Sequence, residues 1–104
     1  MNLCARRRAR KADPRPVLVL PTTQTAPGAQ LLLGRSRGAA IRFADPKVSR
    51  RHAVLHRVDD GWLIADLAST HGTRVNGRAV VAARRLEDGD DLRLGPATRV
   101  RVRT

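Results

Sequence analysis

The chain of 104 residues has little of the amino acids that serve thiol chemistry, metal binding or base stacking. Its one cysteine, Cys4, excludes an internal disulfide and a paired-cysteine zinc site. Phe43 and Trp62 are the only aromatic residues, whereas proteins that grip single-stranded nucleic acid stack bases on several rings. No apolar run reaches the about 18 residues that a membrane span needs. We therefore expect a cytoplasmic protein with no membrane span, metal, cofactor or redox chemistry.

Acidic residues are also scarce, because 9 Asp and Glu stand against 21 Lys and Arg, for a net charge of +12. Of the basic residues 19 are arginine, which is typical of a GC-rich, bacterial genome. Residues 1–16 carry six basic residues and one acidic residue, a net charge of +5, with two prolines and no apolar periodicity. The sequence predicts that they form a disordered basic arm. Such an arm could contact nucleic acid, acidic proteins or anionic lipid, or could simply aid solubility.

The remaining residues, 17–104, indicate one all-β domain with a small aliphatic core of leucine and valine. No segment keeps a helical period for three turns, and short apolar runs alternate with turn signals. Asn76-Gly77 is the strongest hairpin signal. Strands are predicted near residues 17–20, 30–33, 39–43, 52–58, 61–66, 73–75, 79–81, 91–94 and 98–103. In the last strand the valines should point inward and the arginines at 99, 101 and 103 outward.

Three polar loops, residues 34–38, 47–52 and 66–77, are the candidates for function, since loops carry side chains that need not pack. Residues 34–38 match G-x-S-x-G, the nucleophile elbow of serine hydrolases, but an elbow precedes a helix and this segment precedes a predicted strand. Ser49 and His52 lack a third residue to orient the imidazole. His52, His56 and His71 lack the spacing and partners of a metal site. We therefore predict that the protein is not an enzyme.

Taken in order, these loops carry a set of short motifs: Gly34-Arg35, then Ser49-x-x-His52, then Ser69-x-x-Gly-Thr-x-x-Asn-Gly ending at Gly77. The set resembles the forkhead-associated (FHA) domain, and the resemblance covers about residues 17–104. It implies an eleven-stranded β-sandwich of two antiparallel or mixed sheets. The loops at one end of that sandwich would bind phosphothreonine peptides.

The resemblance also implies roles for six residues that contact the peptide. A phosphothreonine carries a charge of about −1.5 to −2 and strong acceptor oxygens, which a guanidinium and a hydroxyl suit. By the resemblance, Arg35 holds the phosphate and Ser49 donates its hydroxyl to it. Lys47 and Arg50 add positive field or peptide contacts, and Thr70 helps to form the pocket for the threonine methyl group.

The sixth position, His71, departs from the family pattern, because many members have an asparagine there that bonds the peptide backbone. A neutral imidazole can donate or accept such a bond but not both, so a pH-dependent affinity is one hypothesis. The residues expected to support the site are Gly34, His52, Gly72, Thr73, Asn76 and Gly77. By the resemblance His52 is buried and braces the loop of Gly72. Gly72, Gly77 and Asn76 are expected where the backbone turns in conformations that other residues disfavour.

The sequence therefore predicts a monomeric phosphothreonine-reading adaptor that recruits a phosphorylated protein, either a Ser/Thr kinase or a kinase substrate. The alternative from a different class is a basic accessory that contacts nucleic acid or an anionic surface through residues 1–16. A third hypothesis is a switch that binds its own phosphorylated segment at Thr22, Thr23 or Thr25.

Overall fold

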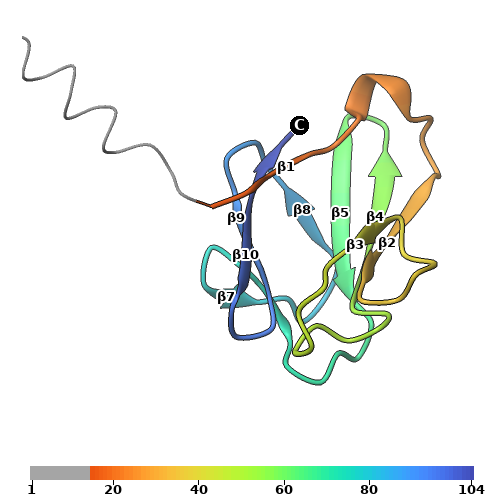
Figure 1. The fold of residues 1–104 in the computed structure, drawn as a ribbon. Helices are drawn as coiled ribbons and strands as arrows, with labels where there is room; N and C mark the ends of the chain where they lie inside the picture. Colours follow the sequence, from red (N-terminus) through yellow and green to blue (C-terminus); the bar gives the residue numbers. More distant parts are fainter. Residues whose placement is uncertain (1–14) are drawn as a thin grey trace, which may run out of the picture.

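The computed structural model describes residues 15–104, which form ten strands and one short 3-10 helix (Figure 1). The elements are β1 (Val17–Val19), η1 (Thr22–Gln24), β2 (Gln30–Gly34), β3 (Ile41–Arg42), β4 (Ala53–Val58), β5 (Gly61–Asp66), β6 (Thr73–Val75), β7 (Arg78–Ala79), β8 (Arg84–Leu86), β9 (Asp91–Leu94) and β10 (Thr98–Arg103). Apart from Arg15 and Pro16, the predicted basic arm lies outside the described residues. No helix within residues 15–104 is long and apolar enough to cross a membrane.

All nine strands predicted from the sequence pattern are present, with small shifts at their ends. The tenth, β8, lies in a segment predicted to be a loop, because its two arginines and single leucine lack the β-branched residues that mark a strand. Its identity as a strand comes from pairing with β5, where Trp62 lies opposite Leu86. The number of eleven strands implied by the resemblance is corrected to ten for the described part of the chain.

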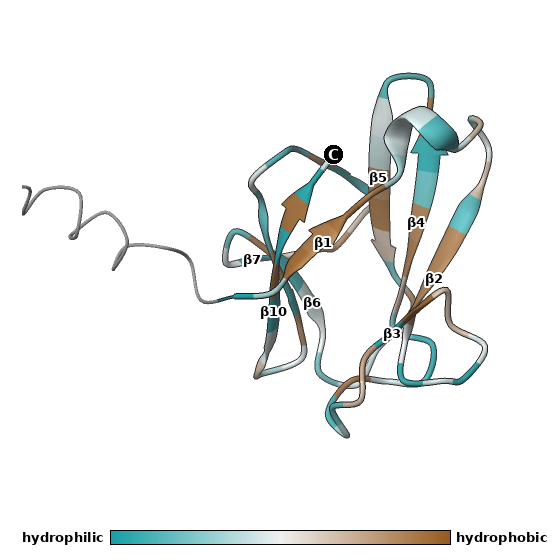
Figure 2. Ribbon diagram, turned by 45° about the horizontal axis from the view of Figure 1, so that its top comes forward, coloured by the Kyte–Doolittle hydropathy of each residue, from teal (hydrophilic) through white to brown (hydrophobic). Residues whose placement is uncertain are grey.

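The strands form two five-stranded sheets, in the orders β1-β10-β9-β6-β7 and β3-β2-β4-β5-β8. β1 runs parallel to β10 and β3 runs parallel to β2, while the other pairs are antiparallel. Both sheets are therefore mixed, and the predicted all-β sandwich is confirmed. Figure 2 shows apolar residues concentrated on the strands and mainly hydrophilic residues at many of the turns.

The core lies between the sheets and is aliphatic except for Trp62, which is fully buried. Its indole Nε1 donates to Thr22 Oγ1 at 3.0 Å, so the polar edge of the ring is satisfied by the η1 turn. Arg57 is also buried and donates to the carbonyl oxygens of Thr22 (2.9 Å) and Gly61 (3.1 Å). The backbone thus compensates the burial of this guanidinium, which the sequence pattern does not reveal.

On the last strand, β10, the valines at 100 and 102 are buried and the arginines face outward, as predicted. The strand register then places three arginines side by side across the outer face of this sheet: Arg99 opposite Arg93, and Arg93 opposite Arg74. Like charges directly opposite one another in a sheet are destabilising. The repulsion within this row lowers stability, and the ion pair between Arg99 and Asp91 at 2.7 Å offsets part of it.

The predicted hairpin at Asn76-Gly77 is confirmed, with φ values of 52° and 83° at the two residues between β6 and β7. Both values are positive, which is the backbone that an Asn-Gly turn favours. Asn76 also donates from Nδ2 to Asp90 Oδ1 at 3.0 Å and accepts from the Asp91 backbone N–H at 2.9 Å. One residue therefore forms the turn and ties it to the start of β9.

Candidate functional site

Three loops come together at one end of the sandwich: the one between β2 and β3, the one between β3 and β4, and the one between β5 and β6 (Figure 1). Each follows or precedes a strand of the sheet β3-β2-β4-β5-β8, so the strand order brings the loops together. They carry the six residues predicted to contact a peptide. The η1 turn with Thr22 and Thr23 lies at the opposite end (Figure 1), which argues against an intramolecular contact with the loops.

The first two loops are joined by their backbones beside Gly34. Arg35 N donates to Ser49 O at 3.0 Å, and Ser36 N donates to Arg50 O at 3.2 Å. A Cβ atom on Gly34 would lie 2.0 Å from the Arg50 carbonyl oxygen, a distance that no side chain can tolerate. Gly34 is therefore required by the close approach of the second loop, not by its own backbone angles.

This junction also orients the Arg35 side chain. Its Nε donates to Val48 O at 3.0 Å, so one edge of the guanidinium is fixed to the protein. The two terminal nitrogens at its other end are the groups that can bind an anion in a forked geometry.

Ser49 links all three loops. Its backbone N–H donates to His52 Nδ1 at 3.0 Å, and its hydroxyl oxygen accepts from the Thr70 backbone N–H at 3.0 Å. Since the hydroxyl acts as an acceptor toward Thr70, its own proton is available to donate to a ligand. The third loop thus positions the Ser49 hydroxyl.

His52 is fully buried and uses both ring nitrogens within the fold. Because Nδ1 accepts from Ser49, Nε2 carries the proton and donates to Gly72 O at 2.9 Å. The same carbonyl also accepts from Gly95 N at 2.9 Å. The imidazole is therefore a brace between the second and third loops, and it is not placed to act as a base toward the Ser49 hydroxyl.

Asp66, at the end of β5, organises the third loop and was not predicted as a site residue. Its carboxylate accepts from Ser69 N (3.0 Å), Ser69 Oγ (2.6 Å) and Thr73 Oγ1 (2.6 Å). Burial raises its pKa, but the bonds from Ser69 and Thr73 outweigh burial and hold the pKa below its ordinary value. Ser69 Oγ also accepts from Gly72 N at 2.9 Å. The spacing of an aspartate three residues before a serine was the available sequence signal.

The loops enclose an open pocket of about 250 Å³ that is lined by Arg35, Ser36, Arg37 and Arg50. Three of these four residues are arginines and none is acidic, so the pocket favours an anion. Two of the lining residues, Arg35 and Arg50, were predicted to contact the phosphate or the peptide. Ser36 and Arg37 were not, because only Gly34-Arg35 of their loop belonged to the set of motifs. That loop leads into strand β3, and Ser36 Oγ accepts from Gly38 N at 3.1 Å.

The other four predicted contact residues, Lys47, Ser49, Thr70 and His71, are not among the lining residues of this pocket. Lys47 and His71 both lie close to Gly95. A Cβ on Gly95 would lie 3.0 Å from Lys47 O and 3.7 Å from His71 Cβ. Asp45 is nearby, and its carboxylate accepts from Thr98 Oγ1 at 2.6 Å and from Lys47 N at 2.9 Å. The Thr98 bond, followed by the Lys47 bond, lowers the pKa of Asp45. These two predicted residues thus lie near the Asp45 carboxylate and outside the lining of the pocket.

No three described side chains of His, Cys, Asp or Glu gather in a way that could hold a metal ion. The chemistry that the loops offer is a forked guanidinium, a serine hydroxyl and further arginines. A phosphate group on a protein is a ligand that suits this combination.

Comparison with known proteins agrees with this class of binding module. Residues 31–95 match the family model of the FHA domain. The FHA domain-containing protein FhaA of Mycobacterium tuberculosis is 45% identical over 64 residues, which are 62% of this chain and 12% of FhaA. The chain spans between about a tenth and two fifths of the length of the first curated relatives that it matches.

Solved FHA domains have the same fold. One, from a structural and functional analysis of phosphothreonine-dependent FHA domain interactions, is 38% identical with a TM-score of 0.69, covering 76% of this chain and 80% of that one. The FhaA FHA domain, complexed with the intracellular domain of Rv3910, is 42% identical with a TM-score of 0.62, covering 69% and 77%.

The fold and the basic loop pocket define a β-sandwich module with one end that suits an anionic ligand. The chain belongs to the FHA domain family, whose members are phosphothreonine-binding modules and not enzymes.

Proposed function

We propose that this chain is an adaptor that binds a phosphothreonine peptide at the pocket of Arg35 and Arg50. One observation carries the proposal: the Arg35 guanidinium and the Ser49 hydroxyl are both held by backbone groups of neighbouring loops, beside a basic pocket with no acidic lining residue. Such groups need no reorganisation when a phosphate enters, which favours tight binding.

In this proposal Arg35 binds two phosphate oxygens through its terminal nitrogens, and Ser49 donates its hydroxyl to a third. Arg50 adds positive charge from the pocket wall. Thr70, whose N–H donates to the Ser49 hydroxyl oxygen, packs against the threonine methyl group in this proposal. Lys47 and His71 contact the peptide beside the phosphothreonine.

The partner that we propose is a phosphorylated protein, either a Ser/Thr kinase or one of its substrates. Two relatives support this type of partner: FhaA is complexed with the intracellular domain of Rv3910, and EmbR of M. tuberculosis is in complex with a low affinity phosphopeptide. We propose that the chain acts as a monomer in the cytoplasm, consistent with its single cysteine, and catalyses no reaction.

The test compares matched peptide pools that carry phosphothreonine, phosphoserine or unmodified threonine, at physiological salt. Arg35→Ala should weaken phosphothreonine binding by at least about tenfold, since a hydrogen bond to a charged group is worth about 1.5–3 kcal/mol. Arg35→Lys keeps the charge but loses the fork, and should restore only part of the affinity. Arg78→Ala, an exposed arginine on β7, is the control for net charge.

Equal binding to all three pools would contradict the proposal, as would equal losses in Arg35→Ala and Arg78→Ala. Binding that is lost on deletion of residues 1–16 and falls steeply with salt would favour the basic-accessory alternative instead.

A further inference from the structure

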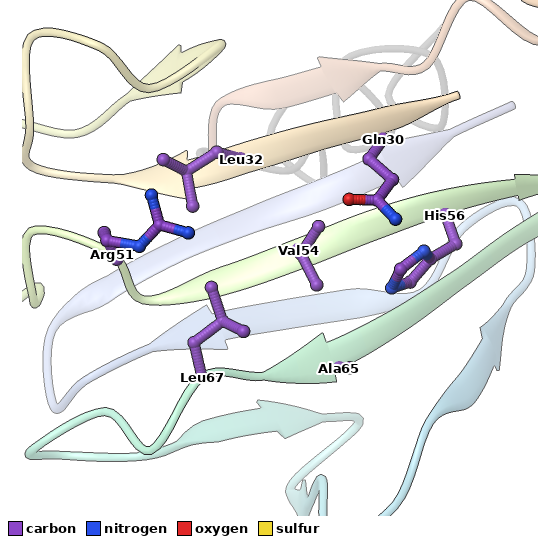
Figure 3. Close-up of a pocket in the computed structure, with 7 residues that line it drawn as sticks. All are labelled: Gln30, Leu32, Arg51, Val54, His56, Ala65 and Leu67. Carbon is purple, nitrogen blue, oxygen red and sulfur yellow. The ribbon is translucent and has the colours of Figure 1, made fainter. Parts of the chain in front are cut away.

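A second hollow, of about 450 Å³, lies on the outer face of the sheet β3-β2-β4-β5-β8 (Figure 3). We call it the side groove. Its floor is an apolar row that crosses three strands, since Leu32 pairs with Val54 and Val54 with Ala65. Leu67, two residues beyond Ala65, also lines the groove. Ala65 is the smallest of these side chains, which leaves space for an incoming apolar group.

The strands under the side groove are already paired on both edges, so an occupant cannot add a strand. β2 lies between β3 and β4, β4 lies between β2 and β5, and β5 lies between β4 and β8. The occupant must therefore bind through its side chains. An apolar side chain seated beside Ala65 is the contact that the groove offers.

The polar lining of the side groove is basic. Arg51 and His56 both line it, and within residues 15–104 neither side chain has a hydrogen-bond or ion-pair partner. None of the lining residues is acidic. A second copy of this chain, with a net charge of +12, would place like charges on this rim. Charge complementarity instead favours a segment that combines apolar and acidic residues.

The side groove begins next to the pocket lined by Arg35 and Arg50, which we call the phosphate pocket. Arg50 lines the pocket and Arg51, the next residue, lines the groove. Figure 3 shows Arg51, Leu32 and Leu67 together toward one end of the groove, with His56 and Gln30 toward the other. A chain held at the phosphate pocket can therefore pass Arg51 and continue along the sheet.

We propose that the side groove is a second contact region for the phosphorylated partner, and that it binds an acidic, apolar segment flanking the phosphothreonine. The proposal rests on the proposed function, because it is the phosphate that brings this segment to the sheet. Recognition then requires two features of one partner polypeptide, which adds selectivity to a phosphate pocket that many phosphothreonines could enter.

The test uses three synthetic peptide pools: a short phosphothreonine core, the same core with a flanking extension randomised among acidic, basic, apolar and small polar residues, and the extension alone. The wild-type domain should select extensions with acidic and apolar residues. The selected peptides should bind about tenfold or more tightly than the short core, which is the gain expected from burying one large apolar side chain.

Two variants address the groove by different means. Ala65→Phe fills it without a change of charge, and Arg51→Glu reverses the charge of its rim. Both should remove the gain from the extension, and Ala65→Phe should leave affinity for the short core unchanged. Arg78→Glu makes the same change of net charge on β7 and should keep the gain. Circular dichroism establishes that each variant is folded.

A domain that binds the short core but gains nothing from any extension would overturn the groove proposal and leave the phosphate pocket intact. A gain that survives both groove variants would also overturn it. Failure of the core to bind, with groove-dependent binding of the extension alone, would overturn the proposed function and keep the groove as a peptide site. A concentration-dependent dimer broken by Ala65→Phe would show that a second copy occupies the groove and would refute the proposal.

Discussion

Replacing His52 with alanine should lower the free energy of unfolding by about 4 kcal/mol. This value is the sum of the contributions of two hydrogen bonds and of the buried ring. The change leaves the partly buried Ser49 N–H without its acceptor, at a cost of about 1–3 kcal/mol. Gly72 O loses one donor but keeps Gly95 N, so this loss is nearer 1 kcal/mol. Removing a fully buried ring adds about 1–2 kcal/mol for the cavity.

A loss of this size is a large fraction of the about 5–15 kcal/mol that stabilises a typical domain. It corresponds to a fall in melting temperature of roughly 20 °C for a domain of this length. Urea unfolding followed by the fluorescence of Trp62, the single and buried tryptophan, measures the change directly.

Two further substitutions separate the two bonds. In His52→Asn, the asparagine Oδ1 can take the place of Nδ1 and accept from Ser49 N. In His52→Gln, the glutamine amide can take the place of Nε2 and donate to Gly72 O. We expect the asparagine variant to keep more phosphothreonine affinity, because Ser49 is the proposed phosphate contact. The reasoning is refuted if His52→Ala costs less than about 1 kcal/mol, or if both amide variants match it in stability and affinity.

Three other outcomes follow from the structure. Gly34→Ala should lower both the phosphothreonine affinity and the free energy of unfolding, because its Cβ would lie 2.0 Å from Arg50 O. Unfolding and binding assays on one sample check this prediction, and an unchanged affinity contradicts it. The contribution of Asp66 to the free energy of unfolding should be fully present well above pH 3.8 and be lost as the pH drops through its lowered pKa. In urea titrations across pH, Asp66→Asn should therefore reduce the acid dependence and leave the part due to Asp45, whose pKa is also lowered. Arg93→Thr should stabilise the domain by about 0.5 kcal/mol at low salt and less at high salt, because it removes a charge opposite two arginines; equal melting temperatures for Arg93→Thr and Arg93→Lys would refute this.

Local signals in the sequence determined most of the strands and the best turn. Alternation of valine and arginine defined β10, and Asn76-Gly77 defined the hairpin, because a period of two and a left-handed turn are properties of neighbouring residues. β8 was not predicted from local signals, because its arginines do not favour a strand and its pairing partner β5 is distant along the chain.

The predicted contact residues were brought together only in part. Arg35 and Arg50 line one pocket, and Ser49 is bonded to Arg35 through its carbonyl oxygen, whereas Lys47 and His71 lie near Asp45 and do not line the pocket. The assignment of all of them to a peptide came from an ordered set of motifs, and their roles stay predictions until binding is measured.

What the sequence determined by itself was therefore an all-β domain with its polar loops and the residue types of an anion site. The tertiary structure decided which loops touch: Gly34 against Arg50, the brace from His52 to Gly72, and the organising role of Asp66. It also decided that a basic, apolar side groove adjoins the phosphate pocket. The physical reason is that these contacts join segments distant along the chain, and the order of strands within a sheet, not the local pattern, sets which segments become neighbours.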